Sequence, residues 1–430
     1  MNQHASPVPD IVDLRRVVLV TVLGGGYVIS QFLRNTVGVI GPDLSAELGL
    51  RPADLGMLAS VFFFTFAAAQ IPAGVLLDRY GARAVMVAFL ALAVAGCLGM
   101  AASDGFAQLI AARAITGVGC ACLLMGPLAI FARWFPKERF ALLTAILLAL
   151  GNLGTLGASA PLAYGAAAFG WRATFAAVAA IAAVTAVIIA LVVRDAPPGA
   201  PPATSRGESW GAAFAGLRTV TRTPSVWRLF AIHTVVYGCF VTVFGLWGGP
   251  FLADVHGYDL VERGNVLLVM AVAQIAGLLL WGSANRMLGG YRRPVLIGGS
   301  ASVALLVFIA AVPDAGPAVL IAWFAAFGLV NGYASVMIAH GRTLFADAHV
   351  GRGLTLLNLA NMGGVFVLQA LTGFVMQAFS GGDVAAASDP DAYRAMFLTL
   401  AGLLAAGLFI YRKAWDPTAD ASEKNSRRVA

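Results

Sequence analysis

The feature that most constrains this chain is a series of twelve long apolar runs. A helix that crosses a bilayer needs about 20 mainly apolar residues. The runs cover roughly 17–41, 54–77, 84–103, 106–132, 141–165, 172–193, 227–252, 264–284, 294–313, 316–340, 353–379 and 392–412. They are continuous rather than alternating, which favours helices over the strands of a membrane barrel. The sequence therefore predicts an all-α polytopic membrane protein with twelve transmembrane helices.

The composition agrees with a chain that lies mostly in lipid. Hydrophobic residues make up 60% and charged residues 11% of the sequence, whereas a soluble domain carries roughly 25% charged residues. The cysteines all lie within apolar runs, which is typical of small buried residues rather than disulfides or metal ligands. They are Cys97, Cys120, Cys122 and Cys239. We expect no metal site and no cofactor.

The distribution of basic residues predicts the orientation in the membrane. If both termini are cytoplasmic, 22 of the 28 Lys and Arg residues fall on the inner side and four on the outer side. The four are Arg51, Arg172, Arg263 and Arg394, while Arg34 and Arg113 lie within spans. This bias is the positive-inside pattern. It accounts for the net charge of +7 without nucleic acid, and the Ala-, Gly- and Arg-rich composition favours a bacterial inner membrane.

The chain divides into two halves at a segment rich in Pro, Gly and Ser. We expect a cytoplasmic N-terminus at 1–16, a six-helix bundle at 17–194, a cytoplasmic linker at 195–226, a second bundle at 227–413 and a cytoplasmic tail at 414–430. The N-terminus lacks the features of a cleaved signal peptide, so the first run is expected to remain as a span. Residues 282–293 are a divergent copy of 74–83, which predicts two pseudo-symmetric halves.

The loop between the second and third runs carries the most specific motif. It reads Gly74-Val-Leu-Leu-Asp78-Arg79-Tyr-Gly81-Ala-Arg83, and this pattern resembles the loop 2–3 signature of the major facilitator superfamily of secondary transporters. We expect Gly74 to permit close backbone approach and Gly81 to adopt positive φ. The resemblance implies that Asp78, Arg79 and Arg83 latch the two halves on the cytoplasmic side. The alternative is an ordinary positive-inside turn.

Further stretches resemble the same superfamily over nearly the whole chain. Residues 113–119 are similar to its fourth-span motif R-x-x-x-G-x-G, and Gly170-Trp171-Arg172 opens the sixth span as it does there. The glycine-rich fifth span is similar to a motif associated with exporters, but Pro161 follows Ala160 rather than Gly. The resemblance implies two six-helix bundles that alternate access to a midplane site. It links Arg113 either to proton coupling or to structural packing.

Arg34 is the leading candidate for substrate binding. Tyr27, Ser30, Gln31 and Arg34 share one helical face of the first span. A charged side chain in the bilayer costs about 2.5–3.5 kcal/mol on insertion scales, so it usually has a function. A guanidinium can hold a carboxylate or phosphate by two parallel hydrogen bonds. A structural arginine that snorkels or binds backbone carbonyls is the alternative.

A closer resemblance narrows the substrate. The stretch F-L-R-N-x₆-P-D-L, from Phe32 to Leu44, is similar to the first span of organophosphate:phosphate antiporters and related organic-anion transporters, whose arginine there contacts the anion. The phosphate exchangers have another arginine in the seventh span, and this chain has none in 227–252 apart from Arg228 at the inner end. One arginine favours a singly charged carboxylate over a phosphate ester.

Other polar residues within the spans complete the candidate set. We expect Tyr27, Gln31, Tyr237, Asn358 and Asn361 to accompany Arg34 at the substrate site, although Asn side chains also join helices to one another. His233 could titrate near neutral pH and couple transport to protons. A packing role for His233 is the alternative, because a lone histidine at a helix end is more often a surface or packing residue. No carboxylate lies in the middle of a predicted span to form a proton relay.

The sequence thus predicts a monomeric secondary transporter that takes up a small organic anion together with protons. A nucleotide-binding loop of the form G-x-x-x-x-G-K-[ST] is absent from the sequence, so we do not expect ATP to drive transport. One alternative is an exporter of drugs or of a metal-chelating metabolite. Another is a membrane receptor that no longer transports. We do not expect an enzyme, because the residues show no catalytic constellation.

Overall fold

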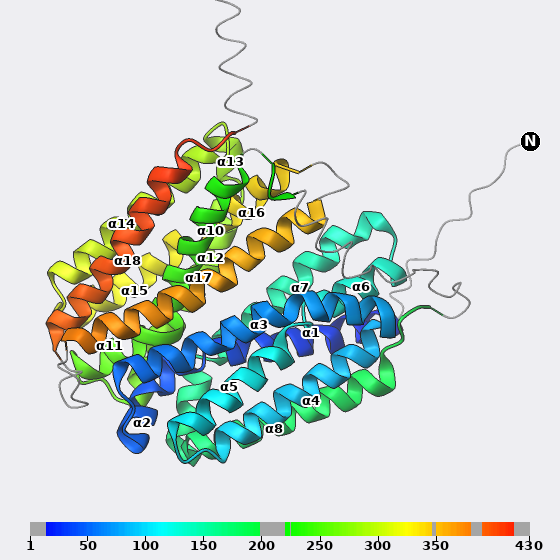
Figure 1. Ribbon diagram of the computed structural model, residues 1–430, viewed down its shortest axis with the longest axis horizontal. Helices are drawn as coiled ribbons and strands as arrows, with labels where there is room; N and C mark the ends of the chain where they lie inside the picture. The colour runs from blue at the N-terminus through cyan, green and yellow to red at the C-terminus, as the bar shows by residue number, and fades with distance from the viewer. Residues whose placement is uncertain (1–13, 198–219, 224, 346–349, 380–388, 417–430) are drawn as a thin grey trace, which may run out of the picture.

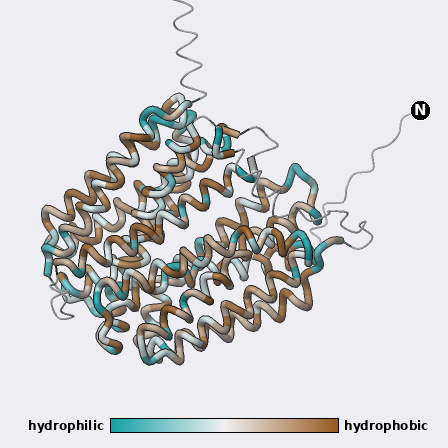
Figure 2. Tube along the Cα trace, viewed as in Figure 1, coloured by the Kyte–Doolittle hydropathy of each residue, from teal (hydrophilic) through white to brown (hydrophobic). Residues whose placement is uncertain are grey.

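A computed structural model describes residues 14–197, 220–223, 225–345, 350–379 and 389–416. The predicted N-terminus up to residue 13, the linker residues 198–219 and the tail from 417 lie outside the described residues. Within the described ranges every regular element is a helix, and twelve stretches are long and apolar enough to cross a membrane. Hydrophobic residues dominate the middle of the helices and hydrophilic ones gather at their ends (Figure 2). The predicted all-α fold with twelve spans is confirmed.

The first half of the chain forms one bundle of helices (Figure 1). Its helices are α1 (Leu14–Asn35), α2 (Val37–Leu48), α3 (Pro52–Tyr80), α4 (Ala82–Ala101), α5 (Phe106–Cys120), α6 (Met125–Trp134), α7 (Lys137–Gly157) and α8 (Ala160–Val192). Within α8 the backbone leaves the helical conformation at Gly170, where φ is 80°. Gly165 lies against Thr174, so the chain reverses at Gly170 and α8 contains the end of the fifth crossing and all of the sixth.

The second half forms another bundle of corresponding helices. Its elements are α10 (Val226–Thr242), the π-helical turn η1 (Val243–Trp247), α11 (Gly248–Asp254), α12 (Leu260–Trp281), α13 (Ala284–Met287), α14 (Arg292–Ala311), α15 (Pro317–Asn331), α16 (Ala334–Thr343), α17 (Val350–Phe379) and α18 (Pro390–Tyr411). The seventh span is thus built from α10, η1 and α11, and the tenth from α15 and α16. Interruptions of this kind are common where transporter spans approach a functional site.

The first crossing differs from its prediction. The expected span over 17–41 is a helix that ends at Asn35 and resumes as α2 at Val37. Pro42 lies within α2, and a proline cannot donate the hydrogen bond that continues a helix toward its preceding turn. The interruption itself falls at Thr36, two residues after Arg34, which lies in the last turn of α1.

The two bundles meet at one end and diverge toward the other (Figure 1). We call the end that carries α2 and α11 the distal face, and the end that carries Leu14, Val192 and Tyr411 the terminal face. At the distal face Gly38 packs directly on the backbone of Phe244 and Gly245, and Gly249 packs on the Gly38 carbonyl. α3 and α17 lie side by side between the bundles. The structure is therefore closed across its distal face by backbone contact.

The internal repeat is visible in two matching contacts at the terminal face. Asp195, just after α8, accepts a hydrogen bond of 2.8 Å from the backbone N–H of Arg83 at the start of α4. Asp416, just after α18, accepts bonds of 2.8 Å from the backbone N–H groups of Tyr291 and Arg292 at the start of α14. A carboxylate at a helix N-terminus satisfies free N–H groups and interacts favourably with the helix dipole. In each half, a carboxylate just after the last span thus caps the third span of that half, which is α4 in the first half and α14 in the second.

Candidate functional site

Arg34 lies buried between the two halves, with only 6% of its surface exposed. Its guanidinium stands over the ring of Phe66 from α3, 4.6 Å from the ring centroid. The hydroxyl groups of Tyr27 on α1 and Tyr237 on α10 interact with the same guanidinium. Its Nε has no hydrogen-bond partner within the described part of the chain. The structure therefore brings Arg34, Tyr27 and Tyr237 together, with Tyr237 contributed by the second bundle. Their role in substrate binding stays a prediction.

The surroundings of Arg34 offer donors rather than negative charge. Among the residues that the structure describes, no Asp or Glu contributes to the electrostatic environment of Arg34. Ser30, one turn earlier on α1, donates to the backbone carbonyl of Cys120 on α5. A cation over an aromatic face is stabilised without being neutralised. The site thus retains a full positive charge in a low-dielectric region, which is the electrostatic requirement for binding an anion.

The other predicted binding residues lie in different pairings. Gln31 packs against Gly151 and Gly154 of α7, and its Oε1 has no hydrogen-bond partner in the described residues. The Asn358 amide donates to Oε1 of Gln70 at 3.1 Å, which joins α17 to α3 across the two bundles. Asn361 bonds to His233 instead of facing Arg34. In this conformation each asparagine thus has a partner other than Arg34.

Arg113 is fully buried, and its guanidinium binds the backbone of the first span. Its guanidinium donates to the carbonyl oxygens of Leu33 at 2.5 Å and Arg34 at 3.2 Å, and to the hydroxyl of Thr36 at 3.3 Å. These are the carbonyls left free where α1 is interrupted. Of the two roles open for Arg113, this geometry fits structural packing: it holds the end of α1 that carries Arg34.

His233 lies on α10 one turn before Tyr237, and only 1% of its surface is exposed. Its Nδ1 is 3.1 Å from Oδ1 of Asn361 on α17, and its Nε2 has no hydrogen-bond partner in the described residues. His340 on α16, by contrast, uses both ring nitrogens: Nδ1 is 2.7 Å from the Tyr411 hydroxyl and Nε2 is 2.8 Å from the Trp415 carbonyl. Only one of these two buried histidines has an open nitrogen.

The residues of the predicted latch have local roles in this conformation. Gly81 has a φ of 84°, as expected for the turn. The Arg83 backbone is bound by Asp195 and its side chain donates to the carbonyl of Ala190, both in the first bundle. Arg79 lies over the ring of its neighbour Tyr80, and Asp78 is exposed at the end of α3. The role of these residues between the halves stays a prediction.

The expectation for Gly74 is wrong in this conformation. Within the described part of the chain, no atom lies within 4 Å of where a Cβ at Gly74 would stand. The close approach of the two bundles occurs instead at Gly38 and Gly249 on the distal face. Sequence spacing alone does not distinguish a glycine in open space from one pressed against a neighbouring helix.

The distal face contains an ion pair that sequence reasoning missed. Arg263 at the start of α12 donates to Asp43 on α2 at 2.6 Å, which joins the second bundle to the first. Asp254 near the end of the seventh span accepts a bond of 2.5 Å from the Tyr393 hydroxyl. Asp43, Asp254 and Arg263 each lie at the end of an apolar run, where the sequence predicts only solvated charges.

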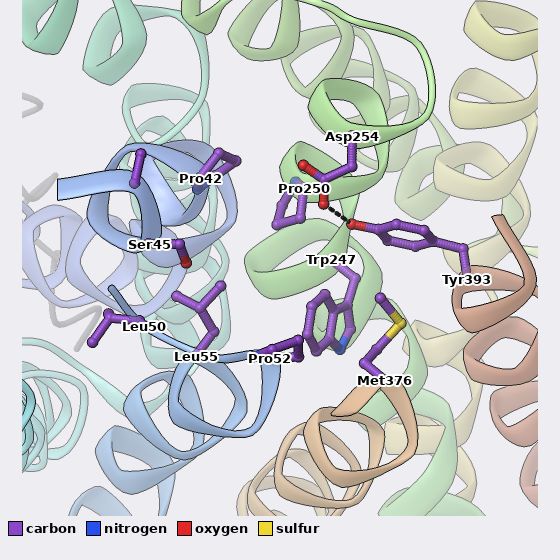
Figure 3. Close-up of a pocket in the computed structure, with 11 residues that line it drawn as sticks. Pro42, Ser45, Leu50, Pro52, Leu55, Trp247, Pro250, Asp254, Met376 and Tyr393 are labelled. Atoms are coloured by element: carbon purple, nitrogen blue, oxygen red, sulfur yellow. Dashed lines mark hydrogen bonds between the residues drawn. The ribbon is translucent and has the colours of Figure 1, made fainter. Parts of the chain in front are cut away.

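A cavity of about 190 Å³ opens beside these residues (Figure 3). It is lined by Pro42, Ser45, Ala46, Leu50, Pro52, Leu55, Trp247, Pro250, Asp254, Met376 and Tyr393. Most of these side chains are apolar, and the acidic group is Asp254, which is bound to Tyr393. A cavity with a carboxylate and no basic side chain repels an anion. It is therefore a different environment from that of Arg34.

Two neighbours of the candidate site were also missed. Phe66 on α3 provides the aromatic face beneath Arg34. Gln70 lies one turn after Phe66 on α3 and accepts a hydrogen bond from Asn358 on α17. Gln70 is the one amide side chain in the apolar run 54–77, and that isolation is the signal that could have identified it. Phe66 has no such signal, because 26 phenylalanines occur in the chain.

Comparison with known proteins agrees with this architecture. Residues 23–340 match the family described as the Major Facilitator Superfamily. The probable nitrate/nitrite transporter NarK2 of Mycobacterium tuberculosis is 27% identical over 297 residues, which is 66% of this chain and 70% of that protein. The membrane sensor protein UhpC of Salmonella typhimurium is 27% identical over 318 residues, 68% of this chain and 69% of that one.

A third relative and a solved structure are also similar to this chain. The probable sulfoacetate transporter SauU of Cupriavidus necator is 25% identical over 271 residues, 60% of this chain and 61% of that protein. A bacterial homolog of the human lysosomal transporter Spinster has the same fold, with a TM-score of 0.78 at 15% identity over 94% of this chain and 97% of that one. The chain is a multi-pass membrane protein of the transporter type, not an enzyme, and it belongs to the Major Facilitator Superfamily.

Proposed function

We propose that the protein is a secondary transporter of a small, singly charged organic anion, with a carboxylate as the group that Arg34 binds. The single observation that carries this proposal is the buried guanidinium of Arg34, which has an open Nε and no acidic partner in the described chain. A buried charge without a counter-ion is costly. An anion bound to Arg34 would neutralise this charge during part of the transport cycle. The cost that is removed would contribute to the free energy of anion binding.

The geometry supports transport rather than simple binding. The Arg34 cluster takes Tyr27 from the first bundle and Tyr237 from the second, so an anion held there would contact both halves. Binding that depends on both halves favours a conformation in which they come together, as alternating access requires. The distal face is closed by the Gly38 and Gly249 contacts. The relevant opening in this conformation would be toward the terminal face.

The relatives are consistent with an anionic cargo. Two of them are named as transporters of anions, nitrate or nitrite for NarK2 and sulfoacetate for SauU. Nitrate carries one charge, which matches a site with one arginine, whereas sulfoacetate carries two at neutral pH. We infer from the Lys and Arg bias that the terminal face is cytoplasmic and that the chain lies in a bacterial inner membrane. In this reading a monomer takes up the anion together with a proton.

A ligand screen on purified protein tests the cargo. Nitrate, acetate, lactate, sulfoacetate and glycerol 3-phosphate are added separately, and thermal unfolding is recorded, because a ligand that binds only the folded state stabilises it by about 2.7 kcal/mol at 100 times its Kd. We expect a monocarboxylate to give the largest shift. Arg34→Ala should abolish it, and Arg34→Lys should retain less than a tenth of the affinity because an ammonium lacks the planar fork.

Matched controls separate loss of binding from loss of folding. Arg394 is an exposed arginine paired with Asp391 on the same helix, so Arg394→Ala should leave the ligand-induced shift intact. Tyr237→Phe keeps the ring and removes the hydroxyl near Arg34, and should weaken anion binding by several-fold. If Arg34→Ala protein reaches the membrane and takes up the anion at the wild-type rate, the proposal is wrong. Stabilisation by hydrophobic cations alone, unchanged in Arg34→Ala, would point to an exporter.

A sensor is the second candidate, favoured by one observation. UhpC, a relative of similar identity, is named as a membrane sensor protein. A sensor would bind the anion at Arg34 without carrying it across. Counterflow in proteoliposomes distinguishes the two functions: a transporter exchanges labelled for unlabelled anion, while a sensor binds it with no exchange above that of Arg34→Ala vesicles.

A further inference from the structure

His233 presents a ring nitrogen that the structure leaves open. The residue is buried, and its Nδ1 faces the side-chain oxygen of Asn361 at 3.1 Å. An amide oxygen only accepts hydrogen bonds, so with the Asn361 side chain in this orientation Nδ1 carries the proton of the neutral ring. The other nitrogen, Nε2, then holds a bare lone pair, and it has no partner in the described residues. This tautomer is ready to accept one proton without breaking its existing bond.

The neighbours of His233 allow its ring to be protonated and deprotonated reversibly. The backbone carbonyl of Met337 on α16 interacts with the ring and can accept a hydrogen bond from a protonated Nε2. Among the described residues, the titratable group that faces the ring is His340 on α16, which is itself bonded to the Tyr411 hydroxyl on α18. α17 contributes the neutral Asn361, and α15 carries no ionisable residue. Within the described part of the chain, no carboxylate therefore acts on His233 to hold it permanently in its charged form.

The position of His233 links it to the anion site. Tyr237 follows it by four residues on α10, so the two side chains lie on one face of the helix about 6 Å apart along its axis. Tyr237 contacts Arg34. On the other side, Asn361 binds His233 while Asn358, one turn earlier on α17, binds Gln70 of the first bundle. His233 thus lies between the anion site and a contact that joins the two halves.

We propose that His233 carries the coupling proton: Nε2 binds one proton in each transport cycle while Nδ1–H remains bonded to Asn361. The assignment rests on the proposed anion transport. A proton from the outer solution forms an N–H bond at Nε2, and that bond breaks when the proton leaves to the inner solution, so the ring returns to its neutral form. Cargo and proton together carry no net charge when the anion is singly charged.

The coupling follows from electrostatics and is reciprocal. An anion near Arg34 makes a positive charge at His233 more favourable, and a protonated His233 raises the affinity for the anion by the same factor. Two unit charges about 10 Å apart, at the effective dielectric constant of a protein interior, change each other's binding by roughly tenfold. The protein without ligands and the protein with both anion and proton bound are therefore favoured over the protein that holds only the anion or only the proton.

The first experiment observes the ring itself and needs no transport. The five histidines are labelled with ¹⁵N in purified wild-type protein, and His233→Gln identifies the signal of His233. We expect Nδ1–H with a bare Nε2 at pH 8, and protonation of Nε2 on acidification. Saturating lactate or nitrate should move the midpoint of that protonation upward by about one pH unit, which is the tenfold coupling. An Nε2–H tautomer at pH 8, or a ring that stays neutral down to pH 4 with and without the anions, overturns the assignment.

The second experiment compares driven uptake with exchange in proteoliposomes. Lactate, nitrate and sulfoacetate serve as probes, first with pH 5.5 outside and 7.5 inside, then as exchange at equal pH. His233→Gln should lower the ratio of driven uptake to exchange by at least tenfold. Asn361→Leu removes the partner of Nδ1 and should shift the pH dependence of that ratio. The matched control is His340→Gln, because both nitrogens of His340 are already bound, and its ratio should equal that of the wild type.

The outcomes separate the two proposals. If Arg34→Ala abolishes exchange but the wild type shows no gradient-driven uptake, anion transport stands and the role of His233 is wrong. If His233→Gln loses the drive while Arg34→Ala exchanges normally, proton coupling stands and the anion site is wrong. An equal ratio in His233→Gln and wild type also overturns the proposal.

Discussion

Asp43 on α2 and Arg263 on α12 form an ion pair of 2.6 Å that joins the two bundles at the distal face. The Arg263 side chain is 5% exposed and the Asp43 side chain 37% exposed. One partner of this pair is buried and the other is partly exposed to solvent. Removing one partner of such a pair is expected to cost more free energy than in a surface pair and less than in a fully buried pair. The proposed alternating access requires the distal face to open, so we predict that this pair breaks once in each transport cycle.

Removing either partner should shift the protein toward an open distal face. We expect Asp43→Asn and Arg263→Gln each to change the balance by about 1–2 kcal/mol, or roughly tenfold in population. The measurement is the rate at which an impermeant thiol reagent modifies a cysteine placed at Ser45, in protein whose native cysteines are replaced by serine. The doubly exchanged Asp43→Arg/Arg263→Asp protein should react as slowly as the parent. Equal rates in both single variants and the parent would contradict a gating role.

Small residues allow the same face to close. A Cβ at Gly249 would collide with the carbonyl oxygen of Gly38, and one at Gly38 with the carbonyl oxygen of Phe244. We therefore expect Gly249→Ala to hinder closure and to raise thiol labelling at Ser45→Cys by at least fivefold. Gly402 on α18 is the control, since no described atom lies within 4 Å of a Cβ there. Gly402→Ala should leave labelling unchanged and can add about 0.5–1 kcal/mol of stability.

Arg113 should matter for stability rather than for coupling. Arg113→Met keeps most of the volume but leaves the carbonyls of Leu33 and Arg34 without their donors. An unsatisfied buried acceptor costs about 1–3 kcal/mol, so we expect a clear fall in the thermal unfolding temperature. The ratio of driven uptake to exchange in the protein that remains folded should match the wild type. A stable Arg113→Met variant with lost proton drive would assign Arg113 to coupling instead.

The two terminal carboxylates should have matching effects. Asp195→Asn and Asp416→Asn remove the negative charge that caps α4 and α14, and each should lower the free energy of unfolding by about 1 kcal/mol. Gly81→Ala should cost more, because φ there is 84° and a Cβ would stand 2.6 Å from Asp195. Thermal unfolding of the three variants gives the comparison. A larger loss for Asp195→Asn than for Gly81→Ala would rule out this account of the turn.

Glu47 gives the protein a defined dependence on acid. It accepts hydrogen bonds from the indole of Trp171 and from Arg172, and these donors hold the pKa of Glu47 below its ordinary value of 4.5. A folded-state pKa below the unfolded value contributes stability above the unfolded pKa, and that contribution is lost as the pH falls through the folded one. Glu47→Gln should therefore be less stable than wild type at pH 7, and the difference in unfolding temperature should shrink below pH 4.5. A difference that is constant from pH 7 to 3.5 would contradict this.

Much of the architecture could be predicted from the sequence, because the bilayer acts on each segment separately. The twelve apolar runs must become helices that satisfy their own backbone groups in lipid, so their number could be counted before any packing was known. Gly81 was predicted to adopt positive φ from its motif, and it does. The boundaries were less accurate at Thr36, inside the predicted run 17–41, and at residues 158–159, inside the predicted run 141–165, where the helix is interrupted by backbone geometry rather than by a change in hydropathy. The reversal at Gly170 falls between the predicted runs 141–165 and 172–193.

The partners of individual side chains were decided by the tertiary structure. Arg34, Arg113 and His233 were each recognisable as unusual polar residues in apolar runs, since placing such groups in lipid is costly. Their sequence contexts do not show that Arg113 is occupied by carbonyls of the first span, that Arg34 retains an open Nε, or that His233 faces Asn361. Hydropathy is a local property of the chain, whereas these contacts join helices that are 79 or 128 residues apart in sequence. Only the packing of the helices determines which of these groups is satisfied and which remains free to bind.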